Sequence, residues 1–529
     1  MEATREKFLI PLVLLVLLFA SYSNSFRDGF HFDDFHQIVE NPNIRSLGNI
    51  PAFFYSAEMG SVNTSLRGYR PVTYASFALS YALSGYSPGG YRLFNLLIHF
   101  LNALLVYVIV RLVVSARGGD GGGEWAAFLA AAAFALHPVQ TNAVTYISGR
   151  AVLLASFFSL ASFYCFLRFR RGGGYAWGAA SPVLFLLGLL SKEMAVALPG
   201  LMLAYDLLMP RAVPRKKRAW PIYIPLAAAL IGFLFIKRVL EGFVVEPSYA
   251  VGPYQYLLAE ARAFLIYLRL AFLPINLNWD YYLPLPKSFN GYALVSGLLV
   301  LAACIVLFRL RRRDPAVSFF GFWFLIALAP ESSIIPIPDT VVEYRLYLPL
   351  AGLLAAASVY AGRLVVRRPA LKGMALAAIA LAGVLTFARN EVWATELTLW
   401  QDVVKKSPWS PRAHFNLGKS YLDLKMYDEA SAELVQVVHG DAAGAISPEL
   451  YIKIGSTLTA IGKYREATEV LERAVAADPG SVVGWTTLAE ACYRAGLLDK
   501  ASLYLSKALN LDPEYPPARL LSREIAGNY

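Results

Sequence analysis

Long apolar runs, separated by short basic segments, constrain this chain more than any other feature of its sequence. The first run covers residues 8–22, and ten more lie at 92–113, 124–137, 149–168, 176–190, 193–208, 220–237, 292–310, 317–330, 346–366 and 371–388. A helix of roughly twenty apolar residues crosses the hydrocarbon core of a bilayer, and the shorter runs need flanking residues to do so. Only 16% of the residues are charged, against roughly a quarter in soluble proteins. The sequence therefore predicts an all-α, multi-pass membrane protein with about eleven spans.

Basic residues predict on which side of the membrane each connection lies. If the first run leads out of the cytoplasm, the second, fourth, sixth, eighth and tenth runs lead back into it. Basic clusters follow each of these returning runs, at Arg111 and Arg117 and within 168–171, 210–218, 309–314 and 363–368. The positive-inside rule thus fits eleven spans and places the loop after 8–22 outside the cytoplasm. An uncleaved signal-anchor is preferred to a cleaved signal peptide for 8–22, and both place that loop outside.

The net charge of +11 is explained by these cytoplasmic loops. Nucleic-acid binding is not expected, because the basic residues fall between apolar runs and do not gather on one domain. One apolar segment, 256–274, does not fit as a span, since it carries Glu260, Arg262 and Arg269. It is interpreted as an interfacial or re-entrant helix within an outer loop at 238–291.

From about residue 395 the chain becomes polar and periodic. One series of residues recurs after 34 positions: Gly455, Leu458, Gly462, Ala467, Leu471, Ala474 and Pro479 are followed by Ala489, Cys492, Gly496, Ala501, Leu505, Ala508 and Pro513. An earlier unit begins near Gly418, with an insertion at 441–447. This period is typical of tetratricopeptide repeats, in which small residues let paired helices pack closely. We expect about three repeats and a capping helix at 516–527, outside the cytoplasm.

Polar residues gather at the outer ends of the expected spans. The stretch FHFDDFHQIVEN (30–41), in a first outer loop at 24–91, carries the adjacent acids Asp33 and Asp34. Other outer loops and span ends contribute Arg70, His137, Arg150, Lys192, Glu193, Glu343 and Arg345. Ionisable groups at this depth are costly, so a whole set on one face favours a functional site. For any single one, an interfacial side chain or a structural ion pair is an equally good interpretation.

The residue types on this face suit one kind of chemistry. Arginine and lysine at span ends bind the phosphate of a membrane lipid well. A carboxylate on the same face can act as a base toward a hydroxyl group. Attack of that hydroxyl on a sugar with a phosphate leaving group needs one base and cations for the phosphate. A single displacement of this kind inverts the sugar carbon.

Several motifs, in order, resemble those of the transmembrane O-mannosyltransferases that carry tetratricopeptide repeats. In chain order they are HFDDFHQIVENPNI, the long stretch from YRPVTYASF to LLVY, HPVQTNAVTYISGRAVLLA, LSKEMAVALPGLMLAYDLL, INLNWDYYLP and VVEYRLYLPLAG. The resemblance covers nearly the whole chain. It implies a GT-C glycosyltransferase domain at 1–390, followed by a repeat domain at 395–529.

The resemblance also implies roles for particular residues. Asp33 and Asp34 match the catalytic acidic pair, and Arg70 and Arg345 are assigned to the phosphate of the lipid. The positions that shape the site are His137, Arg150, Lys192, Glu193 and Glu343. The implied donor is a polyprenyl-phosphate sugar of undecaprenyl or dolichyl type, mannose or another hexose. The implied acceptor is a Ser or Thr hydroxyl of a protein, which the repeats hold. A bacterial or archaeal plasma membrane is favoured, or the endoplasmic reticulum in a eukaryote.

Alternatives stay open at this point. His31 and His36 flank the acids as H-x-D-D-x-H, but alternation along a strand puts only two of the four on each face, so a metal site is the weaker interpretation. No cofactor is expected to be required, although a divalent cation is possible. Three distant cysteines give no disulfide framework and no zinc spacing. The acceptor could be a lipid or a surface polymer. A non-catalytic scaffold would explain the repeats, and a transporter would require repeats among the spans, which are not seen.

Overall fold

The computed structural model describes residues 2–63, 68–115, 122–210, 220–241, 252–283, 285–286, 288–332, 336–337, 339–439 and 447–526, with side chains from residue 9 onward. The regular elements in these ranges are all helical. The chain divides into two compact units, Met1–Thr395 and Glu396–Tyr529. The predicted basic loops near Arg117 and 211–218, and most of the insertion at 441–447, lie outside the described residues.

Each of the eleven predicted apolar runs forms a helix in the first unit. These helices are α1 (Glu2–Tyr22), α4 (Pro88–Ser115), α5 (Gly123–Leu136), α7 (Arg150–Arg170), α8 (Tyr175–Leu189), α9 (Leu198–Leu208), α10 (Trp220–Glu241), α12 (Gly291–Arg313), α13 (Pro315–Leu328), α14 (Tyr347–Arg367) and α15 (Leu371–Asn390). Among the described residues, seven helices are long and apolar enough to cross a membrane, or eight if α5 and the bent segment after it form one span. This confirms a multi-pass, all-α unit, while the count of eleven spans stays a prediction.

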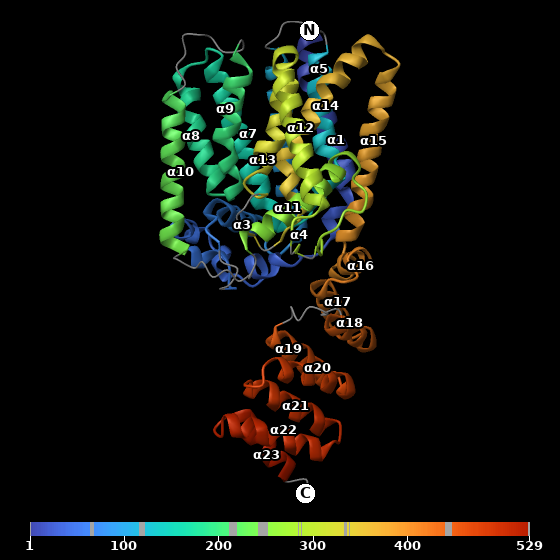
Figure 1. Ribbon diagram of the computed structural model, residues 1–529. Coiled ribbons are helices and arrows are strands. Elements are labelled where there is room, and N and C mark those ends of the chain that lie inside the picture. The colour runs from blue at the N-terminus through green and yellow to red at the C-terminus, as the bar shows by residue number, and fades with distance from the viewer. Residues whose placement is uncertain are drawn as a thin grey trace. The chain divides into compact units, whose positions relative to one another are not determined.

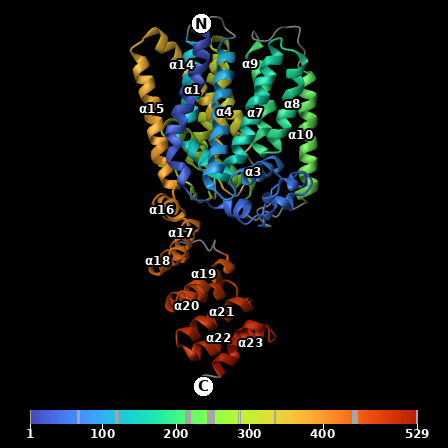
Figure 2. The same ribbon diagram turned by 180° about the vertical axis from the view of Figure 1, so that it is seen from behind.

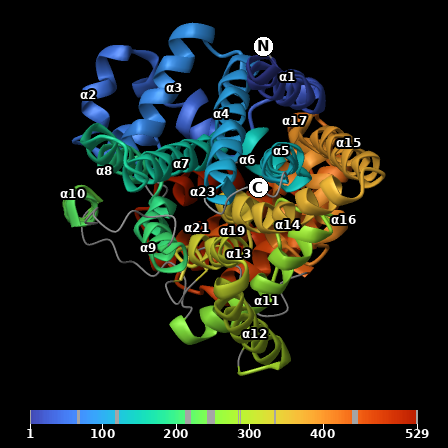
Figure 3. The ribbon, with the colours of Figure 1, turned by 90° about the horizontal axis from the view of Figure 1, so that it is seen from above.

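Close contacts between small residues hold the centre of this bundle together. A Cβ atom at Gly362 on α14 would lie 2.6 Å from the carbonyl oxygen of Gly122 and 2.7 Å from the backbone nitrogen of Ala126 on α5. Glycine is therefore needed where α14 crosses α5. By contrast, α10, α12 and α15 lie at the rim of the bundle (Figure 3) and bury only 17%, 6% and 17% of their apolar windows. Their apolar side chains face outward, as lipid-facing helices require.

Short helices gather at the end of the bundle opposite to the N-terminus (Figures 1 and 2). The first loop contributes α2 (Ile50–Phe53), α3 (Pro71–Ser84) and several 3-10 turns. A buried cluster that includes Ile38, Phe53, Phe77 and Tyr91 holds this loop against the start of α4. The expected interfacial or re-entrant segment is the helix α11 (Pro253–Phe272), and its position in a membrane stays a prediction.

The second unit contains paired helices, as the repeat pattern predicts. They are α16 (Glu396–Lys406), α17 (Pro411–Asp423), α18 (Tyr427–His439), α19 (Pro448–Ala460), α20 (Tyr464–Ala477), α21 (Val482–Arg494), α22 (Leu498–Leu511) and the terminal α23 (Pro516–Ala526). A Cβ atom at Gly455 would lie 2.3 Å from Cγ of Leu471, and one at Gly418 would lie 2.9 Å from Cγ of Leu434. The small residues of the repeat are thus the places where two helices of a pair approach most closely.

Candidate active site

Asp34 is a buried anchor of the first loop. Its side chain is fully buried, and both carboxylate oxygens accept hydrogen bonds. Oδ2 accepts from the backbone N–H of His31 at 3.0 Å, and Oδ1 accepts from the backbone N–H of Ser148 at 2.8 Å and from its hydroxyl group. Burial raises the pKa of Asp34, while these donors and the nearby Arg92 act in the opposite direction. With both oxygens occupied, Asp34 joins the first loop to the turn before α7.

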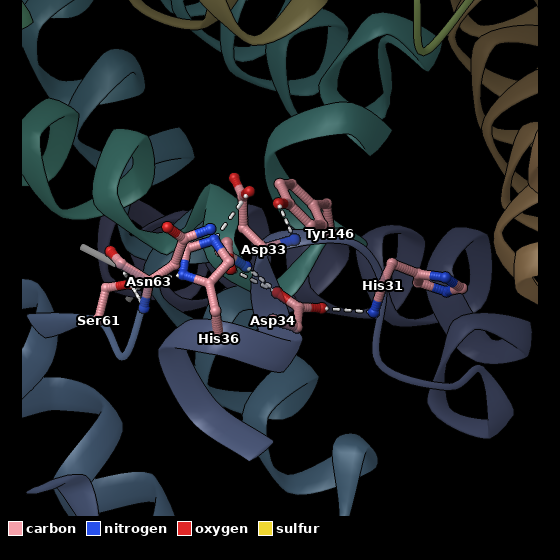
Figure 4. A network of polar contacts seen from close by, with 8 residues as sticks. His31, Asp33, Asp34, His36, Ser61, Asn63 and Tyr146 are labelled. Carbon is pink, nitrogen blue, oxygen red and sulfur yellow. Dashed lines mark hydrogen bonds and ion pairs between the residues drawn. The ribbon is translucent and has the colours of Figure 1, made fainter. Parts of the chain in front are cut away.

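Asp33, in contrast, keeps a third of its side chain exposed. Its Oδ1 lies 3.1 Å from Nε2 of His36, and the Tyr146 hydroxyl group also contacts the Asp33 side chain. Figure 4 shows the carboxylate of Asp33 turned away from Asp34 and toward the side of Tyr146, whose hydroxyl oxygen accepts from the backbone N–H of Asp33 at 3.2 Å. Of the two adjacent acids, Asp33 is the one that a bound molecule can reach.

The backbone just before Asp33 is strained. Phe32 has a φ of +43°, in the left-handed region that bulky side chains avoid. Such a residue costs about 1–2 kcal/mol relative to ordinary backbone. The turn is closed by hydrogen bonds from the backbone N–H of Asp34 to the carbonyl of His31, at 2.8 Å, and from that of Phe35 to the carbonyl of Phe32, at 3.2 Å. Strain of this size is retained mainly where it positions functional groups.

The two histidines point in opposite directions (Figure 4). Nε2 of His31 lies 2.7 Å from the carbonyl oxygen of Trp393. The ring of His36 bridges Asp33 and Ser61, with Nδ1 2.8 Å from the Ser61 hydroxyl oxygen. Within the ranges that the structure describes, no three His, Cys, Asp or Glu side chains converge as a metal site. His31 and His36 thus contact different partners on two sides of the acidic pair, and the need for a metal stays untested.

Aromatic rings from three distant segments meet beside Asp33. Trp279 contacts Tyr146 edge to face, with ring centroids 4.7 Å apart, and contacts Trp393 at 5.2 Å. Tyr146 and Trp393 are stacked at 5.9 Å and are buried. Phe32 completes the group, 6.2 Å from Trp279. The motif INLNWDYYLP thus contributes directly to this end of the bundle, although no residue of it was predicted as part of the site.

Two buried arginines, Arg92 and Arg150, hold the first outer loop and the turns around it in place. Arg92 on α4 donates from Nε to the carbonyl of Thr145 at 3.0 Å, and its other nitrogens donate to the carbonyls of Asp28 and Gly29. Arg150 is fully buried; it donates to the side chain of Asn95 at 2.8 Å and to three further oxygens of α3 and α4. Arg150 is thus a buried brace that does not reach the surface, and its predicted role in shaping the site stays a prediction. Arg92 was not predicted.

Arg70 belongs to a group of alternating charges on α3, the turn before α9, and α10. Its guanidinium lies 3.4 Å from Glu193, which also contacts Lys237. Lys237 lies 3.6 Å from Glu241. Arg70 is partly exposed, and its Nε has no hydrogen-bond partner among the described residues.

Arg345 is placed differently from Arg70. It is 2% exposed, lies 3.3 Å from the buried Glu260 of α11, and donates to the carbonyls of Thr340 and Asp339. Glu343 is fully buried and accepts from the backbone N–H of Asn278 at 2.6 Å and from the hydroxyl of Tyr281 at 2.7 Å. Both side chains therefore hold loops in place at this end of the bundle.

Lys192 and His137 are also buried at this end. Nζ of Lys192 lies 3.3 Å from Glu331 and 3.9 Å from the centre of the Tyr344 ring. Nε2 of His137 lies 3.3 Å from the carbonyl of Ala271, at the end of α11. Arg269 on α11, like Arg92, was not predicted as a site residue, and its buried Nε has no hydrogen-bond partner within the described ranges. Its charge was noted from the sequence, but its position beside Tyr281 follows only from the fold.

Comparisons with known proteins agree with the motifs and the repeats. Tetratricopeptide repeat models match residues 411–438 and 458–525. Three curated relatives are named protein O-mannosyl-transferases. One from Caenorhabditis elegans is 25% identical, covering 77% of this chain and 59% of its own length. One from Drosophila melanogaster is 26% identical and covers 89% of this chain and 59% of its own length. One from Homo sapiens is also 26% identical and covers 79% of this chain and 64% of its own length.

These matches confirm the resemblance seen in the sequence motifs. The chain spans about three fifths of the length of the curated relatives it matches. Among solved structures, the crystal structure of ArnT from Cupriavidus metallidurans bound to undecaprenyl phosphate is 15% identical and covers 83% of this chain and 76% of its own, with a TM-score of 0.40. At that score the likeness does not by itself define a shared fold.

Proposed function

We propose that the chain is an integral-membrane GT-C glycosyltransferase. It transfers a sugar, mannose or another hexose, from a polyprenyl phosphate to a Ser or Thr hydroxyl of a protein. The observation that carries the proposal is the division between the two adjacent acids: Asp34 is buried with both oxygens occupied, and Asp33 is held beside it with its carboxylate partly exposed. The names of the curated relatives point to the same reaction.

In this proposal Asp33 is the base. The acceptor hydroxyl gives its proton to the partly exposed carboxylate of Asp33 as its own oxygen attacks C1 of the sugar. The bond between C1 and the phosphate oxygen breaks, and its electron pair leaves with the polyprenyl phosphate. The new bond forms on the opposite face of C1, so the configuration is inverted. Asp34 acts through Asp33, because it fixes the turn that carries the base.

The leaving phosphate needs cationic groups. We keep Arg70 in this role, since its Nε has no hydrogen-bond partner among the described residues and its side chain is partly exposed. Arg269 is added on the same ground of an unpartnered buried Nε. Arg345 was predicted for the phosphate as well, but its bonds to Glu260 and two carbonyls make it a positioning residue in this proposal. No metal or other cofactor is required for these steps, and the need for a divalent cation is to be tested directly.

The reaction is placed on the extracytoplasmic face, with the repeats on the same side to hold the acceptor protein. Support comes from the basic residues that follow α7, α12 and α14, which the positive-inside rule assigns to the cytoplasm. A reporter fused after Tyr529 should be active only outside the cytoplasm. Activity inside would separate the repeats from the reaction.

The test of the function is transfer by the purified full chain. Wild-type protein, with a polyprenyl-phosphate mannose and a set of Ser- and Thr-containing peptides, should give a glycosylated peptide and free polyprenyl phosphate. Chelator and added magnesium or manganese form separate arms of the assay. If a lipid acceptor is glycosylated and no peptide is, the acceptor part of the proposal is wrong. Full transfer by an Asp33→Asn variant would exclude Asp33 as the base.

A further inference from the structure

Phe32 and Trp279 form an aromatic corner next to the proposed base. Their rings are nearly perpendicular, at 73°, with centroids 6.2 Å apart. Phe32 is 36% exposed and Trp279 is partly exposed. Edge-to-face contact is a favoured arrangement of two aromatic rings, and this pair keeps part of its ring surface open to a bound molecule.

The corner is fixed in place from two sides. Trp279 is supported by the buried rings of Tyr146 and Trp393, which it meets at 75° and 83°. Its segment is tied down by the bond from the backbone N–H of Asn278 to Glu343, at 2.6 Å. Phe32 is held outward by its left-handed backbone, one residue before Asp33. The corner therefore has a defined position relative to the carboxylate of Asp33.

Polar groups lie on the side of the corner that faces the acidic pair. The hydroxyl of Tyr146 accepts from the backbone N–H of Asp33 at 3.2 Å, and Nε2 of His36 lies 3.1 Å from Oδ1 of Asp33. A ligand that fits here has an apolar face for the rings and hydroxyl groups for the polar rim. A pyranose ring has both, since its C–H bonds lie on its faces and its hydroxyls at its edge. A polyprenyl tail would cover these polar groups without forming hydrogen bonds to them, which costs free energy.

We propose that the aromatic corner binds the sugar ring of the donor and holds its C1 in front of Asp33. This inference rests on the proposed function and adds the place and the chemical class of the ring. Glu343, which fixes the segment of Trp279, becomes a positioning residue for the sugar. A sugar-binding role for the corner also gives a reason for the strained backbone of Phe32 beside the proposed base.

The test compares two lipids that differ only in the sugar. A short polyprenyl phosphate, with and without mannose, is bound to full-length protein in lipid nanodiscs, in an Asp33→Asn background that prevents turnover. Trp279→Leu should weaken binding of the mannose-bearing lipid about tenfold and leave binding of the bare lipid phosphate within about twofold. Trp279→Phe should restore most of the lost affinity, and Phe32→Leu should cause a smaller loss with the same selectivity.

Tyr282→Leu is the matched control, because Tyr282 is an exposed aromatic residue, 42% exposed, in the same segment. It should alter neither affinity. Equal weakening of both lipids by Trp279→Leu, or no weakening, would overturn the inference. The outcome is independent of transfer: a chain that binds the mannose-bearing lipid through Trp279 but never glycosylates a peptide would contradict the proposed function alone.

Discussion

Replacing Asp33 and Asp34 separately by asparagine should have opposite consequences, although the two residues are adjacent. Asp34→Asn is expected to lower thermal stability and, through it, activity. Asp33→Asn is expected to abolish transfer and to leave stability almost unchanged. The reason is the difference in surroundings: Asp34 is fully buried with three donors around it, whereas the side chain of Asp33 is one third exposed.

The cost at Asp34 can be worked from its contacts. An asparagine can keep the two bonds from Ser148 on its amide oxygen. Its NH₂ group then faces the backbone N–H of His31, so a bond to a charged acceptor is lost and a buried donor is left without an acceptor. Together these amount to about 3 kcal/mol, which corresponds to a melting temperature lower by about 5 °C for a unit of this size. Unfolding in detergent followed by tryptophan fluorescence would measure it.

The cost at Asp33 falls on the chemical step. Loss of a general base reduces the rate by about 10²–10⁴-fold, so kcat for peptide glycosylation should drop by that factor with KM for the donor little changed. The melting temperature of Asp33→Asn should stay within about 1 °C of wild type, because the side chain of Asp33 is one third exposed and such a partly exposed pair is worth less than about 1 kcal/mol. The opposite assignment, with stability lost at Asp33 and the chemical step lost at Asp34, would refute this reasoning.

Three further perturbations test the supports of the site. Burial raises the pKa of Asp28 to about 6, above its unfolded value, so its contribution to stability is present below about pH 4 and lost as pH rises through 6; Asp28→Asn should raise stability at pH 8 by up to about 3 kcal/mol and change little at pH 4. Gly149→Ala would bring a Cβ atom to 2.4 Å from the carbonyl oxygen of Ala143, so the turn must shift, and both melting temperature and activity should fall. Arg345→Met leaves the buried Glu260 unpaired and should cost about 3–5 kcal/mol, part of which Glu260→Gln should restore; an unchanged melting temperature with a raised KM for the donor would instead return Arg345 to the phosphate.

The sequence predicts the helices of this chain well because their signals are local. An apolar run needs only its own composition to become a helix in a bilayer, and each of the eleven runs is one. The repeat period likewise needs only the spacing of small residues such as Gly455, which indeed marks the close approach of two helices. The acidic pair was identified from its place after the first run.

What the sequence could not predict depends on contacts between distant segments. The sequence does not reveal that the Asp34 side chain turns inward to Ser148, 114 residues away, while the side chain of Asp33 stays partly exposed. Arg150 carries a charge near a span end, as a site residue would, yet it is buried and donates to the carbonyl oxygens of Ser76 and Tyr91 on α3 and α4. Trp279 is brought to Tyr146 only by the fold, so its role could not be inferred from spacing.

The contact between His31 and the carbonyl of Trp393, at 2.7 Å, joins positions 362 residues apart. His31 leaves the ribosome among the first residues of the membrane unit, and Trp393 among its last. The loop that carries the proposed base therefore cannot take its final form until the ribosome has synthesised the last membrane helix and that helix has been inserted. A partly made chain would hold the acidic pair but not its anchor, and the order of synthesis would delay activity until the whole membrane unit is complete.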